Sequence, residues 1–258
     1  MAGDASSARA ALAAGYRYAE AVLSPLTALA ALRAYPAFFR DRRRYRELAG
    51  TDALALRDDW PVLLDRTAET AFEPHYTFQD GWAARLVAER RPAHHVDVGS
   101  RVSYVVGLSA WVPVTFVDIR PLTIDLDGLD SIAGSLLALP FEDGALESIS
   151  CLHVAEHIGL GRYGDPLDPQ GTVKAASELQ RVLAPGGRLL FSLPVGRPRT
   201  QFNAHRVHDP RAIPALFDEL RLERFDGVDD GDELRRAIEP DELADCAWGC
   251  GLYAFVRD

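Results

Sequence analysis

A short segment rich in histidine and glutamate carries the clearest potential for chemistry in this chain. His153, Glu156 and His157 follow the apolar run Leu146–Leu152, and His205 follows the next such run. If residues 153–157 were helical, positions i, i+3 and i+4 would share one face. Imidazole and carboxylate groups bind divalent metals or move protons. Three interpretations stay open: a metal site of His153, Glu156, His157 and His205, a metal-free His157 base paired with Glu156, or a structural role.

Alternating helices and short apolar strands must position these residues. From residue 80 onward we expect strands at 95–98, 114–118, 131–133, 146–152, 188–193, 222–225 and 252–256, with helices at 81–91 and 172–183. Strands that alternate with helices form a mostly parallel sheet covered on both faces. The pattern therefore predicts an α/β domain over residues 80–258, built on a seven-stranded, mostly parallel sheet.

Two strand ends carry residues suited to ligand binding. Ligands of such sheets bind beyond the carboxyl ends of the strands. The first expected strand ends in Gly99, where the missing Cβ lets the backbone approach a ligand, and the second ends in Asp118, whose carboxylate suits ribose hydroxyls. Arg101, Ser103 and Tyr104 stand where a dinucleotide site would continue its spaced glycines. This departure disfavours NAD as the ligand.

Two further segments resemble class I S-adenosylmethionine-dependent methyltransferases. GSLLALPFEDGAL, residues 134–146, resembles the segment that passes the adenine, and RVLAPGGRL, residues 181–189, is similar to the helix, turn and fifth strand of that superfamily. The resemblance implies a Rossmann-like fold and S-adenosylmethionine as cofactor. It implies contacts from Gly99 to the methionine carboxylate, from Asp118 to the ribose and from Ser135 and Leu136 to the adenine. Further expected contacts are Asp97, Ser100 and Leu152, with Tyr76 and Gln79 closing over the methionine end.

The histidine cluster itself resembles a known metal site. Small-RNA 3′-terminal 2′-O-methyltransferases and ubiquinone-pathway O-methyltransferases have Glu-x-x-Glu-His, and here His153 replaces the first glutamate. The resemblance implies a divalent ion, for which magnesium, zinc, iron and manganese are all suitable. Either a metal or a histidine base would help to remove the proton of an acceptor hydroxyl.

Longer stretches resemble a little-characterised methyltransferase-like family of unknown function from bacterial glycan gene clusters. They are PHYTFQDGW at 74–82, HVDVGS at 95–100, SCLHVAEHIGLGRYGDP at 150–166 and QFNAHR at 201–206. Arg162, Tyr163 and Asp165 offer the charged and aromatic groups that suit sugars, although a turn-rich connector would also use them. We expect O-methylation of a sugar hydroxyl in a saccharide, polysaccharide or glycolipid. RNA 2′-O-methylation and a non-catalytic, cofactor-binding scaffold are the alternatives.

The composition narrows the class of protein further. A net charge of -10 over 258 residues argues against general nucleic-acid binding, and 48% hydrophobic residues supply a large core. Three cysteines are too few for a disulfide framework, which fits reduced thiols in a cytoplasmic protein. The apolar stretch Ala21–Leu32 is interrupted by Pro25 and is shorter than the roughly 20 residues of a transmembrane helix.

Residues 1–79 are expected to form a helical extension and a linker. The pattern predicts helix from Ser7 to Leu48 with breaks near Pro25 and Pro36, then irregular chain from 58 to 76. The basic, aromatic run FFRDRRRY at 38–45 fits a solvated helix face, or a docking surface for a partner or an anionic membrane. The extension also offers helices through which the chain could form a homo-oligomer.

Overall fold

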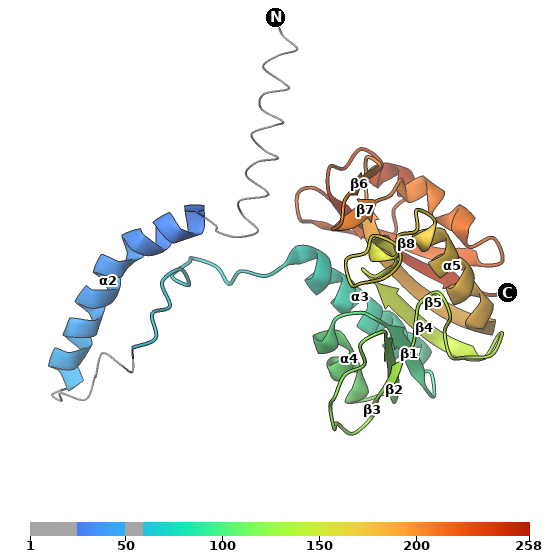
Figure 1. Cartoon of the computed structure of the whole chain (residues 1–258), viewed down its shortest axis with the longest axis horizontal. Coiled ribbons are helices and arrows are strands. Elements are labelled where there is room, and N and C mark those ends of the chain that lie inside the picture. Colours follow the sequence, from blue (N-terminus) through green and yellow to red (C-terminus); the bar gives the residue numbers. More distant parts are fainter. Residues whose placement is uncertain (1–24, 50–58) are drawn as a thin grey trace, which may run out of the picture. The chain divides into compact units, whose positions relative to one another are not determined.

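The computed structural model describes residues 25–49 and 59–258, which belong to two compact units, Met1–Ala71 and Phe72–Asp258. The first unit contains helix α2, Pro25–Ala49 (Figure 1). Within that unit, Arg42 Nε donates to Asp59 Oδ2 at 2.7 Å, which joins the later segment to the helix. The helix expected over residues 7–24 lies outside the described residues.

Helix α2 corrects one expectation, because it continues through Pro36 without a break. Proline removes one hydrogen bond of the helix, but good helix formers on both sides offset that cost. Tyr35 also stacks on Phe39 across the proline, with ring centroids 5.9 Å apart. The packing of Tyr35 on Phe39 thus helps to keep the helix continuous at Pro36, where the sequence predicted a break.

Helix α3, Pro74–Arg90, begins seven residues before the expected start at 81. The Glu73 carboxylate accepts a hydrogen bond from the Tyr76 backbone N–H at 2.7 Å, and Pro74 stands in the first turn, where its missing N–H has no partner to lose. The end of the expected linker is therefore helical. The second compact unit starts at Phe72 rather than at residue 80.

The sheet of the second unit confirms the expected α/β class. Its strand order is β3-β2-β1-β4-β5-β10-β8-β9. The first five strands are parallel, while β10 runs antiparallel to β5 and β8, and β9 runs antiparallel to β8. There are eight strands rather than seven, because a two-residue strand extends the edge. Their bounds are β1 His95–Val98, β2 Val114–Asp118, β3 Leu129–Ala133, β4 Leu146–Leu152, β5 Leu183–Val195, β8 Arg221–Val228, β9 Leu234–Arg235 and β10 Gly249–Val256.

Helices cover both faces of this sheet, as Figure 1 shows. One face is covered by α3 and by α4, Val102–Ser109. Trp82 of α3 and Leu108 of α4 belong to one apolar cluster with Leu252 of β10. On the other face, α5, Gly171–Val182, packs Leu179 in a second apolar cluster. The two clusters use alternate residues of the same strands, which is how a strand buried on both sides contributes to two cores.

The connections beyond the strand ends contain elements that the sequence pattern did not predict. After β4 comes a 3-10 helix, η2, Ala155–His157, and after β5 comes a hairpin of β6, Arg199–Gln201, and β7, His205–Val207. Three further 3-10 helices are η3 Pro210–Ala212, η4 Pro214–Leu216 and η5 Pro240–Leu243. Among the described residues, no helix has both the length and the apolar character needed to cross a membrane.

Candidate functional site

The turn after β1 is shaped by a fully buried carboxylate. Asp97 accepts hydrogen bonds from the Ser100 backbone N–H at 3.0 Å, from the Ser100 hydroxyl at 2.7 Å and from the Ser150 hydroxyl. Burial raises the pKa of Asp97 to about 7 even though these donors favour its charged form. Asp97 and Ser100 therefore act within the turn rather than as free ligand groups.

Gly99 occupies this turn in the left-handed region, with φ +69°. A Cβ at this position would lie 3.1 Å from a methyl group of Val154 and 3.6 Å from Oδ2 of Asp118. Asp118, at the end of β2, accepts a hydrogen bond from the Arg120 backbone N–H at 2.7 Å. The bare backbone of one strand end thus lies beside the carboxylate of the next, as the sequence predicted.

A cavity of about 300 Å³ opens beyond these strand ends. It connects Gly99 and Asp118 with the segment Gly134–Leu137 and with the histidine cluster after β4. Its wall consists of Val98, Gly99, Val117, Asp118, Ile119, Arg120, Gly134, Ser135, Leu136, Leu137, His153, Val154, His157, Ile158, Tyr163, Gly164, Asp165 and Pro166. Four residues expected at a cofactor, Gly99, Asp118, Ser135 and Leu136, therefore share one cavity wall.

Three other expected cofactor residues lie away from that wall. The side chain of Leu152 is buried in the core, and its N–H donates to the Ser100 hydroxyl at 3.1 Å. Gln79 is fully buried and accepts a hydrogen bond from the Ser192 hydroxyl at 2.5 Å. Tyr76 lies against His153, with ring centroids 5.2 Å apart. These side chains pack behind the cavity and hold α3 against the sheet.

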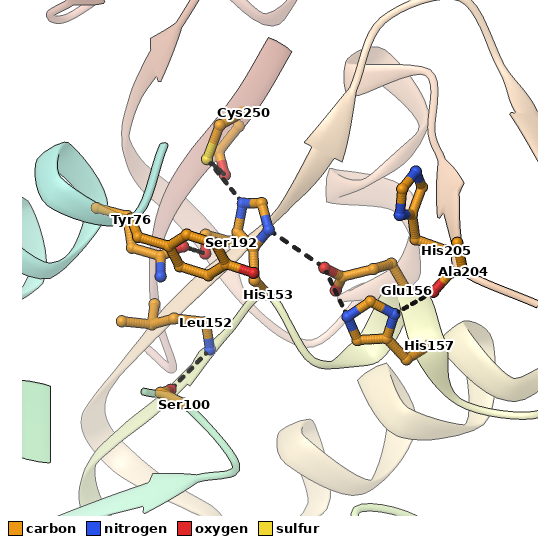
Figure 2. A network of polar contacts seen from close by, with 12 residues as sticks. Tyr76, Ser100, Leu152, His153, Glu156, His157, Ser192, Ala204, His205 and Cys250 are labelled. Atoms are coloured by element: carbon orange, nitrogen blue, oxygen red, sulfur yellow. Dashed lines mark hydrogen bonds and ion pairs between the residues drawn. The ribbon is translucent and has the colours of Figure 1, made fainter. Parts of the chain in front are cut away.

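The cluster after β4 is compact although its backbone is not an α-helix. His153 has φ +56°, and the 3-10 turn that follows brings the three side chains together. Oε1 of Glu156 lies 3.3 Å from Nδ1 of His153 and 3.6 Å from Nε2 of His157 (Figure 2). Glu156 is fully buried, whereas both histidines retain a small exposed fraction and line the cavity.

The glutamate of this cluster has an unusual polar environment. Among the described residues, neither carboxylate oxygen of Glu156 has a hydrogen-bond partner of good geometry, and its ion-pair partners are the imidazoles of His153 and His157. Burial alone would raise the pKa of Glu156, but His153 and His157 hold it below its ordinary value. Burial would lower the pKa of His153, but the sulfur of Cys250 and the Glu156 carboxylate raise it well above 6.5.

His157 has one ring nitrogen engaged and one turned toward the glutamate. Its Nδ1 donates a hydrogen bond to the Ala204 carbonyl at 2.6 Å (Figure 2). With the proton on Nδ1, Nε2 keeps its lone pair on the side of Glu156. Nε2 is therefore a proton acceptor that has the Glu156 carboxylate 3.6 Å from it.

The expected four-residue metal site is not assembled. Nε2 of His205 is hydrogen-bonded to the side-chain oxygen of Gln201. The His205 ring packs on the Trp248 ring, with ring centroids 4.4 Å apart. Burial lowers the pKa of His205 to about 4. Within residues 25–49 and 59–258, the potential ligand group is instead His75, His153 and Cys250. The ring centroids of His205 and His157 are 6.4 Å apart, so a site that joins His205 with Glu156 and His157 stays a prediction.

The loop expected to bind substrate stands at the cavity wall. Tyr163 lies under Arg120, whose guanidinium carbon is 4.5 Å from the ring centroid, and Arg162 lies 5.2 Å from the same centroid. Asp165 accepts hydrogen bonds from the backbone N–H groups of Gly159 at 2.6 Å and Tyr163 at 3.2 Å, so its carboxylate holds the loop. Tyr163 and Asp165 line the cavity, but Arg162 does not.

Sequence reasoning missed two members of the buried cluster. Cys250 of β10 lies 3.1 Å from Nε2 of His153, and His75 of α3 stacks on Trp248 with ring centroids 5.8 Å apart. The composition alone indicates ordinary reduced thiols at all three cysteines. A signal existed in the sequence, since His75 lies in one of the stretches of the family resemblance, but its partners are more than 70 residues away.

Comparison with known proteins supports the fold. NodS, an N-methyltransferase from Bradyrhizobium japonicum WM9 solved with S-adenosyl-l-homocysteine, is 18% identical over 77% of this chain and 92% of its own, with a TM-score of 0.50. A geranyl diphosphate methyltransferase solved with S-adenosylmethionine is 15% identical over 74% and 93%, also at 0.50. The [4+2]-cyclase SpnF is 13% identical over 69% and 81%, again at 0.50. The chain shares the Rossmann-like fold of class I methyltransferases.

The comparisons of sequence cover less of the chain than the comparisons of structure do. A family model described as a Caenorhabditis protein of unknown function, DUF268, matches residues 129–229, which is less than half of the chain. No curated protein matches the sequence. The matched segment runs from β3 to β8 and includes the cluster after β4. It does not contain Gly99 or Asp118.

Proposed function

We propose that this protein is an S-adenosylmethionine-dependent O-methyltransferase that acts on a sugar hydroxyl of a saccharide, polysaccharide or glycolipid. The observation that carries the proposal is the single cavity shared by Gly99, Asp118, Ser135 and the histidine cluster. One end offers groups suited to a nucleoside, and the other offers a proton acceptor. A methyl transfer from a nucleoside sulfonium to a hydroxyl needs both.

The residues at the first end fit the cofactor. Gly99 has no Cβ to fill the space between Val154 and Asp118, so a ligand can approach the backbone there. The Asp118 carboxylate would accept the ribose hydroxyl protons, and Leu136 would contact the adenine. When bound, S-adenosylmethionine supplies an electrophilic methyl group. In the class I methyltransferases that this segment resembles, an acidic residue often stands at the position of Ser135, so here the adenine amino group would depend more on backbone acceptors.

His157 is the base in this proposal. Its Nδ1–H is fixed by the Ala204 carbonyl, and its Nε2 lone pair would accept the proton of the acceptor hydroxyl as the oxygen bonds to the methyl carbon. The electron pair of the broken carbon–sulfur bond stays on sulfur, which becomes a neutral thioether. Glu156, 3.6 Å from Nε2, would stabilise the imidazolium that forms. The proton then leaves to solvent.

The acceptor class rests on the loop beyond the cluster. Tyr163 provides an aromatic surface at the cavity wall, which suits the C–H face of a sugar. Arg120 and Arg162 place positive charge beside that ring, although the whole chain carries a net charge of -10. A saccharide that bears carboxylate or phosphate groups would match this local charge.

Ligand-dependent thermal stability tests the cofactor assignment. S-adenosylhomocysteine should raise the melting temperature of the full chain by mass action, whereas NAD should not. Asp118→Ala should remove most of this shift, and Asp130→Ala, an exposed carboxylate on β3, serves as the matched control. A shift with NAD and none with S-adenosylhomocysteine would contradict the proposal.

A second experiment separates an enzyme from a cofactor-binding scaffold. Release of S-adenosylhomocysteine is measured with a panel of neutral, uronic-acid and phosphorylated glycans and with single-stranded RNA. We expect turnover with a charged saccharide. Tight cofactor binding without turnover on any glycan would support the scaffold, and turnover with RNA alone would contradict the acceptor class.

A further inference from the structure

Three buried side chains that could bind a soft metal ion meet behind the cavity wall. His75 comes from α3, His153 from the end of β4 and Cys250 from β10. One ligand atom from each residue lies within 4.8 Å of the other two, and Nε2 of His153 is 3.1 Å from Sγ of Cys250. Their exposed fractions are 3%, 9% and 0%. Segments far apart in the sequence therefore converge on one point.

We propose that His75, His153 and Cys250 form a binding site for Zn²⁺ or a related soft divalent cation. Two imidazoles and one thiolate are the nitrogen and sulfur donors that zinc prefers, and they disfavour magnesium and calcium, which take oxygen ligands. Three protein ligands leave one position of a tetrahedron for water or another exogenous ligand. This set differs from the site expected from sequence, since it excludes His157 and His205.

The groups around the two histidines support this assignment. Metal-bound histidines usually donate their second N–H to a carboxylate or a backbone carbonyl, which fixes the ring. Nδ1 of His153 lies 3.3 Å from the Glu156 carboxylate while Nε2 is turned to Cys250, as Figure 2 shows. The His75 ring stacks on Trp248, with ring centroids 5.8 Å apart. Neighbouring groups therefore hold both imidazole rings in place.

The charge of the cluster is compatible with a bound cation. Glu156 is fully buried, and without a metal its nearby ion-pair partners are the imidazoles of His153 and His157, at 3.3 and 3.6 Å. In the metal-bound cluster both imidazoles are neutral, so a divalent cation, the Cys250 thiolate and the Glu156 carboxylate sum to zero charge. Binding would displace the protons of Cys250 and His153 to solvent, with no redox step.

The same residues could be compared with a Cys-His-Glu nucleophilic triad, but the surroundings disfavour that role. Cys250 is fully buried in the strand between β5 and β8, within an apolar cluster, and such surroundings disfavour a reactive thiol. A nucleophile also needs no third ligand, and the triad leaves the convergence of His75 unexplained. The metal site accounts for all three residues.

Metal analysis and cobalt substitution of the full chain test the proposal without any activity assay. We expect zinc to copurify, and the chelator-treated protein to bind Co²⁺ with intense tetrahedral d–d bands and a thiolate-to-cobalt charge-transfer band. Cys250→Ser should remove the charge-transfer band. Cys250→Ser and His75→Ala should each weaken Zn²⁺ binding by more than about 100-fold, and Glu156→Gln by roughly 10-fold. Cys246→Ser, a half-buried thiol outside the cluster, is the matched control.

The wild-type protein alone can overturn the proposal, so it does not depend on whether a variant folds. The proposal is overturned by two results together. The purified wild type contains no zinc, and the folded, chelator-treated wild type shows no charge-transfer band when Co²⁺ is added. Persistence of the band in a folded Cys250→Ser variant would exclude this ligand set. Rapid alkylation of Cys250 in the native metal-free and metal-loaded forms alike would favour a reactive thiol instead. Binding of S-adenosylhomocysteine, measured separately, tests the proposed function and can fail independently.

Discussion

Asp97 and Glu156 are both completely buried carboxylates in the second unit, yet they lie in opposite polar environments. Asp97 receives hydrogen bonds from Ser100 and Ser150, which close the turn after β1. Glu156 has no well-oriented hydrogen-bond donor among the described residues, and its carboxylate lies 3.3 and 3.6 Å from two imidazoles. Native proteins keep such an unsatisfied buried group chiefly where it serves a ligand or a reaction. The first carboxylate shapes the binding site, and the second is available for chemistry.

The largest effect on turnover should come from substitutions in the cluster around Glu156. Glu156→Ala and His157→Ala should each lower turnover by at least roughly 100-fold, the usual cost of losing general acid–base help. Turnover is measured as release of S-adenosylhomocysteine at saturating acceptor. His94→Ala, an exposed histidine before β1, should stay near wild type. If both cluster variants also turn over at the wild-type rate, the cluster is structural and the comparison with Asp97 fails.

Asp97 should instead affect how the free energy of unfolding depends on pH. Its folded pKa of about 7 lies above the ordinary value of 3.8, so its contribution is complete below pH 3.8 and is lost as the pH rises through 7. The unfolding equilibrium of wild type relative to Asp97→Asn should therefore shift toward the unfolded state by up to about tenfold per pH unit in this window. Urea denaturation of both proteins between pH 4 and pH 8 measures it. A constant difference in unfolding free energy would show that Asp97 is charged throughout.

The strand framework was predictable from sequence because its signals are local. Short segments rich in apolar residues, which are followed by Gly99 or end in Asp118, marked β1 and β2 to the residue, and β4 was marked likewise. The failures were those of long-range packing. His205 follows the expected strand, but the β6–β7 hairpin directs its ring to Gln201 and Trp248. Cys250 meets His153 only because β10 inserts between β5 and β8, and no local pattern indicates that pairing.

A smaller effect, on the affinity for S-adenosylhomocysteine, is expected from a substitution at Gly99 in the turn that Asp97 closes. Gly99→Ala adds a Cβ 3.1 Å from Val154 at φ +69°, where a side chain is strained, and occupies the space beside Asp118. We expect roughly tenfold weaker S-adenosylhomocysteine binding, about 1.4 kcal/mol, because the added methyl group fills space that the ligand would use. Titration calorimetry measures it. Gly107→Ala in α4, whose Cβ would contact nothing within 4 Å, is the control and should bind as wild type does. Equal affinities for the two variants would place the cofactor away from this turn.

The smallest effect is expected from the first unit. Every residue of the cavity wall lies between positions 98 and 166, and the first unit ends at Ala71. We propose that the N-terminal extension contributes to packing or to assembly of a homo-oligomer rather than to the chemistry. A chain that starts at Phe72 should therefore bind S-adenosylhomocysteine within about twofold of the full chain, since it keeps every residue of the cavity wall. Its mass in solution, from light scattering, should fall below that of the full chain by more than the deleted residues if the extension mediates assembly. A folded truncation that keeps cofactor affinity but no longer uses the acceptor would show that the extension completes the acceptor site.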